Sequence, residues 1–333
     1  MRRLLWVLVS GLSGLVIWLA LFFIRPLPLP HTPYVFELPS GLGLRAVAQQ
    51  LVQKGVLPEP WTFTWVGRVL GEQSHLKAGS YEWLQPLTGW QMLRQMARGE
   101  GDAWQVQIIE GTTFAQLRAL LAQQPSLRQD SAGLSDSAVM AHLGAAGQSP
   151  EGWFFPDTYF YNPGESDWSI LERAHRAMSE RLAQVWATRD PHLALTDPYQ
   201  ALILASLIEK ETANREERAR ISAVFLNRLR LDMRLQTDPT VIYGLGTDYD
   251  GHLHHRDLHR DNAYNTYTRS GLPPTPIALP GAAALQAAVH PLAVPDLFFV
   301  ARGDGTHQFS TTLEAHQQAV QRYQTKRTTD HER

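Results

Sequence analysis

Glu209 is the residue of this chain best suited to acid–base chemistry. It lies in the segment ALILASLIEKE, residues 201–211, which is apolar until Glu209 interrupts it. A helix of this composition is apolar around nearly its whole circumference and is therefore expected to be buried. A single carboxyl group partly withdrawn from water has its charged form disfavoured, so its pKa rises and it can hold a proton near neutral pH. Glu209 is a candidate general acid.

Glu211, the other glutamate of this segment, points to roughly the opposite face of the predicted helix. The two glutamates are therefore not expected to work as a pair. A structural role for Glu209 stays open, in which it pairs with Lys210 or with an arginine of the next helix. The catalytic hypothesis requires the Glu209 side chain to open toward a groove, and a buried ion pair without a channel would count against it.

Several sequence blocks occur in a characteristic order: LASLIEKET, FLNRLRLDMRLQTDPTVIYGLG, AYNTYTRSGLPPTPIALPG, AAVHP and LFFVARGDGTHQFSTTLEAH. Together they resemble the family of membrane-anchored endolytic murein transglycosylases that contain a YceG-like domain. The resemblance implies that Glu209, the first glutamate of the EKE triplet, is catalytic. It also implies a set of sugar-binding residues: Gln236, Asp238, Tyr243, Tyr264, Asn265 and Tyr267. Thr275, where glycine is usual, and Leu279, where a small or polar residue is usual, depart from the family pattern.

The implied reaction is endolytic cleavage of the MurNAc-GlcNAc β-1,4 bond of nascent peptidoglycan strands, which leaves a 1,6-anhydroMurNAc end and would terminate strand elongation. Ordinary glycosidases need two carboxyl groups. A transglycosylase needs one, because the C6 hydroxyl of the same sugar replaces water as the nucleophile. Asp238 could instead be a second carboxylate, which would make the enzyme a hydrolytic muramidase. A non-catalytic glycan-binding scaffold is the alternative from another functional class.

Some candidate residues have simpler interpretations. Asp238 before Pro239 is a common turn residue, and asparagine at position 265 is a residue type that caps loops. Four histidines at positions 252, 254, 255 and 259 invite a metal site, but they lack the HExxH helix spacing and lie in a polar loop. We therefore expect neither a metal nor a cofactor.

Composition narrows the function classes further. The chain has 333 residues, enough for two or three domains, and a formal net charge of -2. Without a basic stretch it is not expected to bind nucleic acid. It contains no cysteine, which excludes disulfides and thiolate chemistry. The resemblance implies peptidoglycan glycan strands as substrate and membrane-bound peptidoglycan synthases as partners.

The segment from Leu4 to Ile24 is uncharged and apolar, and as a helix it would span about 30 Å, the thickness of a bilayer core. Arg2 and Arg3 precede it, so the N-terminus is expected in the cytoplasm and the catalytic region in the periplasm. A cleaved signal peptide is the alternative, although bulky residues occupy the place of a cleavage site. The segment predicts a single-pass protein of the inner (cytoplasmic) membrane.

We expect an α+β fold with an N-terminal transmembrane helix, a small LysM-like α+β module and a larger mixed α/β catalytic domain. The predicted boundaries are 1–26 for the cytoplasmic tip and anchor, 27–34 for a proline-rich spacer, 35–100 for the LysM-like module and 101–333 for the YceG-like catalytic region. Local patterns predict strands at 35–38 and 80–84, helices at 44–52 and 61–70, and a capping box formed by Thr88 and Gln91. Residues 297–301 and 308–310 predict a hairpin, and 313–323 a final helix.

Overall fold

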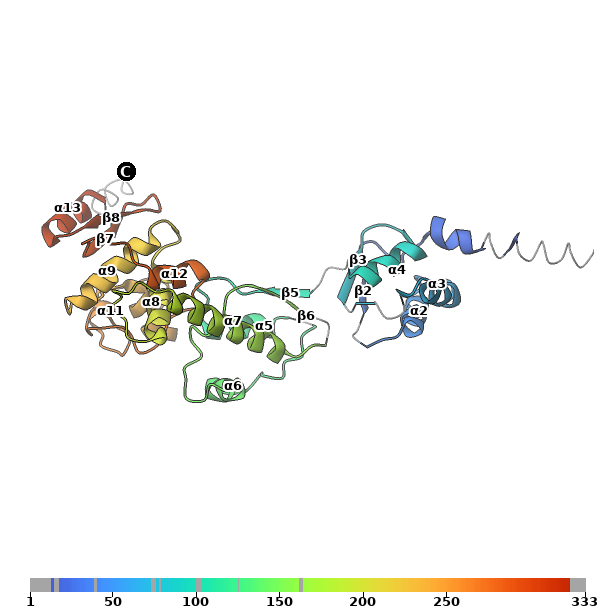
Figure 1. Cartoon of the computed structure of the whole chain (residues 1–333), viewed down its shortest axis with the longest axis horizontal. Coiled ribbons are helices and arrows are strands. Elements are labelled where there is room, and N and C mark those ends of the chain that lie inside the picture. Colours follow the sequence, from blue (N-terminus) through green and yellow to red (C-terminus); the bar gives the residue numbers. More distant parts are fainter. Residues whose placement is uncertain are drawn as a thin grey trace, which may run out of the picture. The chain divides into compact units, whose positions relative to one another are not determined.

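The computed structural model describes residues 13–14, 18–38, 41–72, 76–77, 79–99, 104–124, 126–161 and 164–323. These residues form two compact units (Figure 1). Unit 1 comprises Met1–Val106, Gln124–Asp130 and Tyr159–Asp167, and unit 2 comprises Gln107–Gln123, Ser131–Thr158 and Trp168–Arg333. Helices dominate, and the strands of the described residues pair in two-stranded sheets. The predicted α+β fold is thereby confirmed, whereas the four predicted segment boundaries and the LysM-like character of the first module stay predictions.

Unit 1 is a small α+β body whose described strands pair as β1–β4, β2–β3 and β5–β6. Its elements are β1 (Pro26–Leu27), β2 (Tyr34–Leu38), α2 (Leu44–Gln53), α3 (Trp61–Val69), β3 (Gly79–Trp83), β4 (Leu87–Thr88), α4 (Gly89–Arg98), β5 (Trp104–Gln107) and β6 (Thr158–Tyr161). Strand β2 pairs with β3 from Tyr34 opposite Trp83 to Leu38 opposite Gly79. Alternate residues of β2 are buried, as a half-covered strand requires. The Thr88–Gln91 capping box is present and starts α4, as predicted.

The predicted membrane-spanning helix over Leu4 to Ile24 is corrected by the fold. Among the described residues, no helix has both the length and the apolar composition needed to cross a bilayer. Residues 4–12 and 15–17 of this segment lie outside the described part of the chain. Residues 18–24 are helical, and Phe22 is buried in the core of unit 1 against Phe63. On this finding, the predicted single-pass inner-membrane localisation is wrong.

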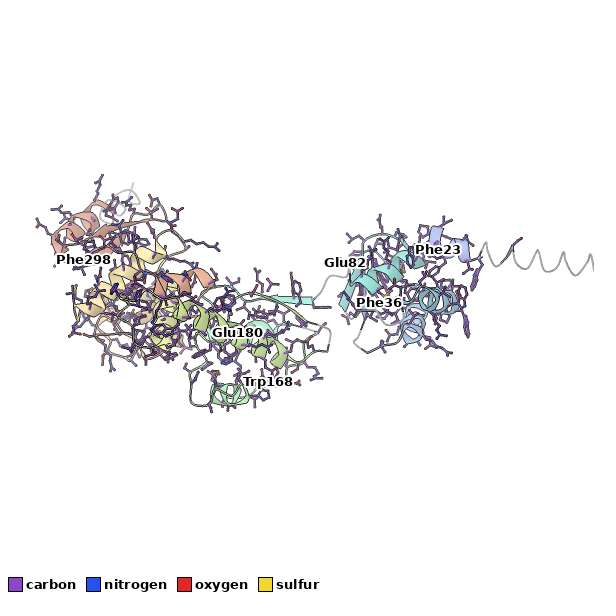
Figure 2. All side chains as sticks on the ribbon, viewed as in Figure 1. Phe23, Phe36, Glu82, Trp168, Glu180 and Phe298 are labelled. Carbon is purple, nitrogen blue, oxygen red and sulfur yellow. The ribbon has the colours of Figure 1, made fainter. Side chains whose placement is uncertain are left out.

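Unit 2 is built mainly from helices. They are α5 (Phe114–Ala122), α6 (Asp136–His142), α7 (Asp167–Ala187), α8 (Pro198–Glu211), α9 (Arg218–Arg230), α10 (Asp238–Leu245), α11 (His255–His259), α12 (Ala282–Val289) and α13 (Leu313–Tyr323), with the short 3-10 helix η2 (Gly246–Asp248). Strands β7 (Phe298–Ala301) and β8 (His307–Ser310) form the predicted hairpin. Trp168, near the start of α7 and labelled in Figure 2, stacks on His142 of α6 with ring centroids 3.8 Å apart.

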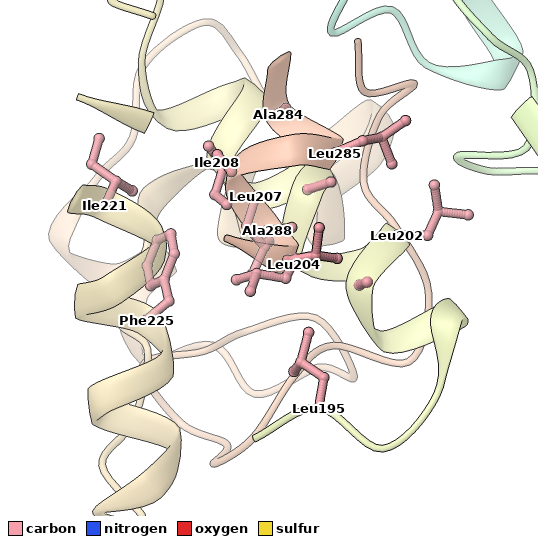
Figure 3. Close-up of a cluster of buried hydrophobic side chains, with 14 of the residues drawn as sticks. Leu195, Leu202, Leu204, Leu207, Ile208, Ile221, Phe225, Ala284, Leu285 and Ala288 are labelled. Carbon is pink, nitrogen blue, oxygen red and sulfur yellow. The ribbon is translucent and has the colours of Figure 1, made fainter. Parts of the chain in front are cut away.

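Helix α8 is the centre of unit 2. Every residue from Ala201 to Ile208 is buried, because α9 and α12 pack against it (Figure 3). Ile221 and Phe225 of α9 contact one side, and alanines of α12 let that short helix approach the other side closely. The helix begins at Pro198 after an Asp197 cap, whose carboxylate accepts the Gln200 N–H. Close packing over this length fixes the direction in which the last, polar turn of α8 presents its side chains.

Candidate active site

The Glu209 side chain lies in a buried ion pair. Its Oε1 accepts from the Arg218 guanidinium at 2.8 Å and its Oε2 accepts a second guanidinium N–H at 3.3 Å. The Gly281 backbone N–H, at the start of α12, donates to Oε2 at 2.9 Å. The side chains of Glu209 and Arg218 are each 5% exposed. The structural alternative left open by the sequence, pairing with an arginine of the next helix, is the arrangement observed.

Opposing effects act on Glu209. Burial raises the pKa of the Glu209 carboxyl above its ordinary value, and the Gly281 N–H and the Arg218 guanidinium offset that shift only in part. Three hydrogen bonds from Arg218 and Gly281 use three of the roughly four acceptor sites of the carboxylate. The Glu209 carboxylate thus links the last turn of α8 to Arg218 at the start of α9 and to Gly281 at the start of α12.

Glu110, which is exposed, lies beside this ion pair. Its Oε2 lies 3.9 Å from the Arg218 guanidinium, and its carboxylate packs so closely on Gly281 that a Cβ atom there would clash with it. The adjacent Gly111 N–H donates to the Leu279 carbonyl at 2.9 Å. Leu279 is one of the two departures from the family pattern. Its backbone carbonyl accepts this hydrogen bond, and its side chain is buried. We interpret this cluster as the clamp that joins residues 110–112 to the start of α12.

Glu211 faces a different environment, on the opposite side of α8. It lines a pocket of about 450 Å³ together with residues from α9, α10, the β7–β8 hairpin and α13. The lining includes Arg228, Gln236, Asp238, Tyr267, Phe298, His307 and His316. Its side chain accepts one hydrogen bond, from the Thr237 hydroxyl to Oε2 at 2.6 Å. Glu211 thus combines a neutral hydrogen-bond partner with a position in the lining of this pocket.

The electrostatic surroundings favour a protonated Glu211. Burial raises the pKa of the Glu211 carboxyl, and the nearby charge of Asp238 raises it further. The Thr237 hydroxyl, a protonated His307 and the Arg228 guanidinium act in the opposite direction. Because the net shift is upward, the carboxyl can hold a proton at a pH where an exposed glutamate is ionised.

Three of the six predicted sugar-binding residues lie in the Glu211 pocket. Gln236, Asp238 and Tyr267 line it, and the Tyr267 hydroxyl donates to Asp238 Oδ1 at 2.5 Å. Gln236 has a backbone φ of 51°, a conformation that non-glycine residues adopt at a cost. Its N–H donates to the Thr266 carbonyl at 3.2 Å, which helps to hold this backbone in place. A strained residue at a pocket wall is typical of a functional site.

The other three predicted residues lie outside the Glu211 pocket. Asn265 is fully buried, and its amide donates to three backbone carbonyls of the preceding segment, at Asp257, Leu258 and Arg260. Its Oδ1 accepts the Tyr267 N–H at 2.8 Å, so it shapes the loop that presents Tyr267. Tyr243 and Tyr264 form a T-shaped ring pair 4.8 Å apart, and the Tyr264 hydroxyl is 2.9 Å from Thr275 Oγ1.

Sequence reasoning missed Arg228, His307 and His316 as lining residues, and it set Glu211 aside. Arg228 looks like an ordinary surface arginine in the sequence, yet its guanidinium donates to the carbonyls of Leu297, Arg234 and Leu235. Phe298, labelled in Figure 2 on β7, packs against the same guanidinium at 5.1 Å. The helical wheel had indicated only that Glu211 points away from Glu209. The pocket becomes visible only when the hairpin is placed against α9.

Comparison with known proteins agrees with this architecture. The model of the YceG-like family matches residues 36–322 of the chain. The chain belongs to the YceG-like family. The endolytic murein transglycosylase of Bacillus subtilis is 31% identical over 306 residues, covering 86% of this chain and 84% of the relative. The endolytic murein transglycosylase of Streptococcus pneumoniae serotype 2 is 25% identical over 317 residues, covering 85% of this chain and 57% of the relative. A crystal structure of a YceG-like protein from Listeria monocytogenes has 30% identity and a TM-score of 0.56, and the match covers 86% of this chain and 98% of that one.

A second buried glutamate, Glu151, lies in the same YceG-like unit. Its Oε1 accepts the Phe114 N–H at the start of α5, and its Oε2 accepts the Tyr243 hydroxyl, both at 3.0 Å. These two donors favour the carboxylate, but burial outweighs them and raises the pKa of Glu151 to about 7. The hydroxyl of Tyr243, which was predicted to bind sugar, therefore donates a hydrogen bond to the buried carboxyl group of Glu151.

The raised pKa of Glu151 predicts a specific loss of stability with rising pH. In the unfolded chain this carboxyl has its ordinary pKa of about 4.3. The folded protein therefore binds the proton more tightly than the unfolded chain. The resulting stabilisation of the folded state is complete below the unfolded pKa of about 4.3 and is lost as the pH rises through 7. For Glu151→Gln we expect the stability relative to wild type to increase by about 3 kcal/mol between pH 4 and pH 8. Urea unfolding of both proteins at each pH measures this, and a pH-independent difference would contradict it.

Proposed function

We propose that this chain is an endolytic murein transglycosylase that cleaves the MurNAc-GlcNAc β-1,4 bond and leaves a 1,6-anhydroMurNAc end. The relative from Bacillus subtilis that carries this activity in its name aligns with 86% of the chain. Cleavage within a nascent strand would end its elongation. Partnership with peptidoglycan synthases, which the resemblance implies, stays a prediction.

The observation that carries the proposal is the pocket around Glu211. It brings together one carboxyl group whose pKa is raised, an amide from Gln236 and a phenol ring from Tyr267. The amide and the phenol suit the hydroxyl and acetamido groups of amino sugars, and the ring offers a stacking face. Glu209, the acid that the family resemblance implies, stays the alternative to Glu211, and its carboxylate is paired with Arg218.

One carboxyl group is enough for the proposed reaction. Protonated Glu211 gives its proton to the glycosidic oxygen of the leaving N-acetylglucosamine. The C6 hydroxyl of the muramic acid then attacks C1 of its own ring, so no water has to be positioned and activated. The 2-acetamido group can stabilise positive charge at C1 in between.

Hydrolysis is the second candidate reaction, favoured by the position of Asp238 in the same pocket. Inverting glycosidases place a second carboxylate where it activates water. One Asp238 oxygen, however, already accepts the Tyr267 hydroxyl. A carboxylate committed to a phenol is a weaker base, which favours transglycosylation.

Digestion of purified glycan strands in oxygen-labelled water separates the two reactions. Transglycosylation yields anhydro ends that contain no label, because water does not enter the product. Hydrolysis yields reducing ends that are heavier by one labelled water. Mass spectrometry of the fragments measures both, and we expect unlabelled anhydro ends. Labelled reducing ends would identify a muramidase, and uncleaved strands that remain bound would identify a scaffold.

A further inference from the structure

One guanidinium nitrogen faces two carboxylates at the end of α8. Arg218 Nη2 donates to Glu209 Oε1 at 2.8 Å and lies 3.9 Å from Glu110 Oε2. The second distance is too long for a hydrogen bond, so Arg218 is bonded to Glu209 and is only attracted to Glu110. Two carboxylates and one guanidinium together carry more negative than positive charge. Lys210 also lies beside them, but it is exposed and donates to the Gly111 carbonyl at 3.3 Å.

The three side chains differ in their access to solvent. The Glu110 side chain is 37% exposed, whereas those of Glu209 and Arg218 are each 5% exposed. A glycan strand that approaches Glu209 from solvent therefore covers Glu110. Covering Glu110 removes water from an ionised carboxylate, which is costly unless a counter-charge comes closer. The Arg218 guanidinium, 3.9 Å away, is such a counter-charge.

Arg218 is held less firmly than its burial suggests. Its Nε is buried, yet it has no hydrogen-bond partner among the described residues. Arg228 is a contrasting case, because its guanidinium donates to three backbone carbonyls. Both hydrogen bonds described for Arg218 go to the Glu209 carboxylate. A small rotation of the guanidinium can therefore exchange Glu209 for Glu110.

Glu110 is held in place by the backbone beside it. Two backbone hydrogen bonds, of 2.9 and 2.8 Å, join residues 111–112 to Leu279. The Glu110 carboxylate packs against Gly281, the residue whose N–H donates to Glu209. Glu110 thus presents a carboxylate of fixed position next to the Glu209 carboxylate.

We propose that Glu110 is a positioning residue that takes the Arg218 guanidinium from Glu209 when a glycan strand covers the site, and so leaves Glu209 free to hold the catalytic proton. The inference rests on the proposed transglycosylase function and on Glu209, the acid that the family resemblance implies. Without a strand, the ion pair satisfies both buried groups. With a strand bound, Arg218 neutralises Glu110, and Glu209 becomes neutral by taking up a proton. A glutamate found in an ion pair can in this way serve as a general acid.

The proton and electron balance closes without another reactant. Glu209 takes a proton from solvent as the strand binds, and gives it to O4 when the C1–O4 bond breaks and O4 keeps the electron pair. The C6 oxygen forms the new bond to C1, and its proton passes to the Glu209 carboxylate. Glu110 stays ionised throughout. When the product leaves, Arg218 returns to Glu209, whose proton goes back to solvent.

The charges around Glu209 support this direction. Burial raises the pKa of the Glu209 carboxyl, and the charge of Glu110 raises it further. The Gly281 N–H and the Arg218 guanidinium act in the opposite direction. When Arg218 moves toward Glu110, one of the two opposing groups is withdrawn, and the pKa of Glu209 rises again. The enzyme with a bound strand therefore keeps its acid protonated to a higher pH than the ion pair alone would allow.

The full-length Glu110→Gln variant tests this role. The amide has the size of the carboxylate but no charge, so Arg218 stays on Glu209 and lowers its pKa. We expect the alkaline limb of the kcat profile on purified glycan strands to move at least about one pH unit toward lower pH. Above the shifted limb kcat should be about tenfold below wild type, whereas on the acid side it should agree within about threefold. KM should stay within about threefold of wild type throughout, because Glu110 acts on the acid and not on affinity.

Two further variants control for charge and for packing. Glu110→Asp keeps the charge on a shorter side chain, so we expect its alkaline limb to lie between those of wild type and Glu110→Gln. Glu216→Gln makes the same chemical change at an exposed glutamate two residues before Arg218 and should behave as wild type. Melting temperatures show whether each variant is folded.

The outcomes separate this inference from the proposed function. If wild type releases anhydro ends while folded Glu110→Gln keeps the wild-type alkaline limb, or loses kcat equally at every pH, the positioning role is overturned and the transglycosylase assignment stands. If folded Glu209→Gln keeps full activity, Glu209 is not the acid and the role of Glu110 falls with it. If wild type itself yields no anhydro ends, the proposed function has failed.

Discussion

Glu211→Gln is expected to lower the release of anhydro ends from glycan strands by a factor of about 100 to 10,000 while strand binding persists. The amide keeps the size of the side chain and can still accept the Thr237 hydroxyl, but it cannot donate a proton to the glycosidic oxygen. Because the uncatalysed loss of an N-acetylglucosamine alkoxide is slow, removing the acid affects turnover more than affinity. Chromatography of the fragments measures the rate, and sedimentation with insoluble peptidoglycan measures binding.

Glu209→Gln is the matched control for that experiment, since it makes the same chemical change two residues away. We expect its principal effect to be on stability, because the glutamine leaves a buried Arg218 without a counter-charge. A folded Glu209→Gln protein without activity, beside an active Glu211→Gln protein, would show that the acid is Glu209, as the sequence resemblance implied. Full activity in both variants would remove either glutamate from the mechanism.

Arg218→Met is expected to destabilise the protein by about 3–5 kcal/mol at neutral pH. The methionine fills much of the same volume, so the change removes charge and hydrogen bonds with little cavity. Glu209 is then left buried with only the Gly281 N–H, and a carboxylate in that state bears an uncompensated desolvation cost. Urea unfolding followed by circular dichroism measures the loss of free energy.

The double variant Glu209→Gln with Arg218→Met tests the origin of that loss. It removes both charges, so most of the destabilisation should disappear. A loss below about 1 kcal/mol in the single variant would mean that water reaches the pair. A loss as large in the double variant as in the single one would place the cost in packing, with the ion pair contributing little.

Elements governed by local patterns were predicted well. The capping box of Thr88 and Gln91, the strand at 35–38 and the hairpin of residues 297–301 and 308–310 each depend on residues near one another in sequence. Helix α8 was predicted to be buried all round because a helix without a polar face has no other stable position, and it is. Residues 236–281 contain the helices α10 and α11, which the sequence analysis did not predict.

Composition misled the prediction at the N-terminus. An apolar segment of about bilayer length is compatible with a membrane and with a protein core, because hydropathy measures only how unfavourable it is for the side chains to stay in water. In the described part of that segment, Phe22 packs into unit 1. The same limitation applies to Glu209, whose partner Arg218 looks in the sequence like one of many surface arginines.

The amino-acid sequence by itself determined which helix would be buried, that its two glutamates would face apart, and which residue types would surround a sugar. Tertiary structure decided what surrounds each of these two glutamates. Helix periodicity gives the direction of Glu209 relative to Glu211, but the surroundings of each side chain depend on which elements pack against that side of α8. Arg218 and Gly281 neutralise one side of α8, whereas the β7–β8 hairpin, about 100 residues away in sequence, leaves a pocket on the other. Long-range packing of this kind has no local signature, because it depends on side chains that only the complete fold brings together.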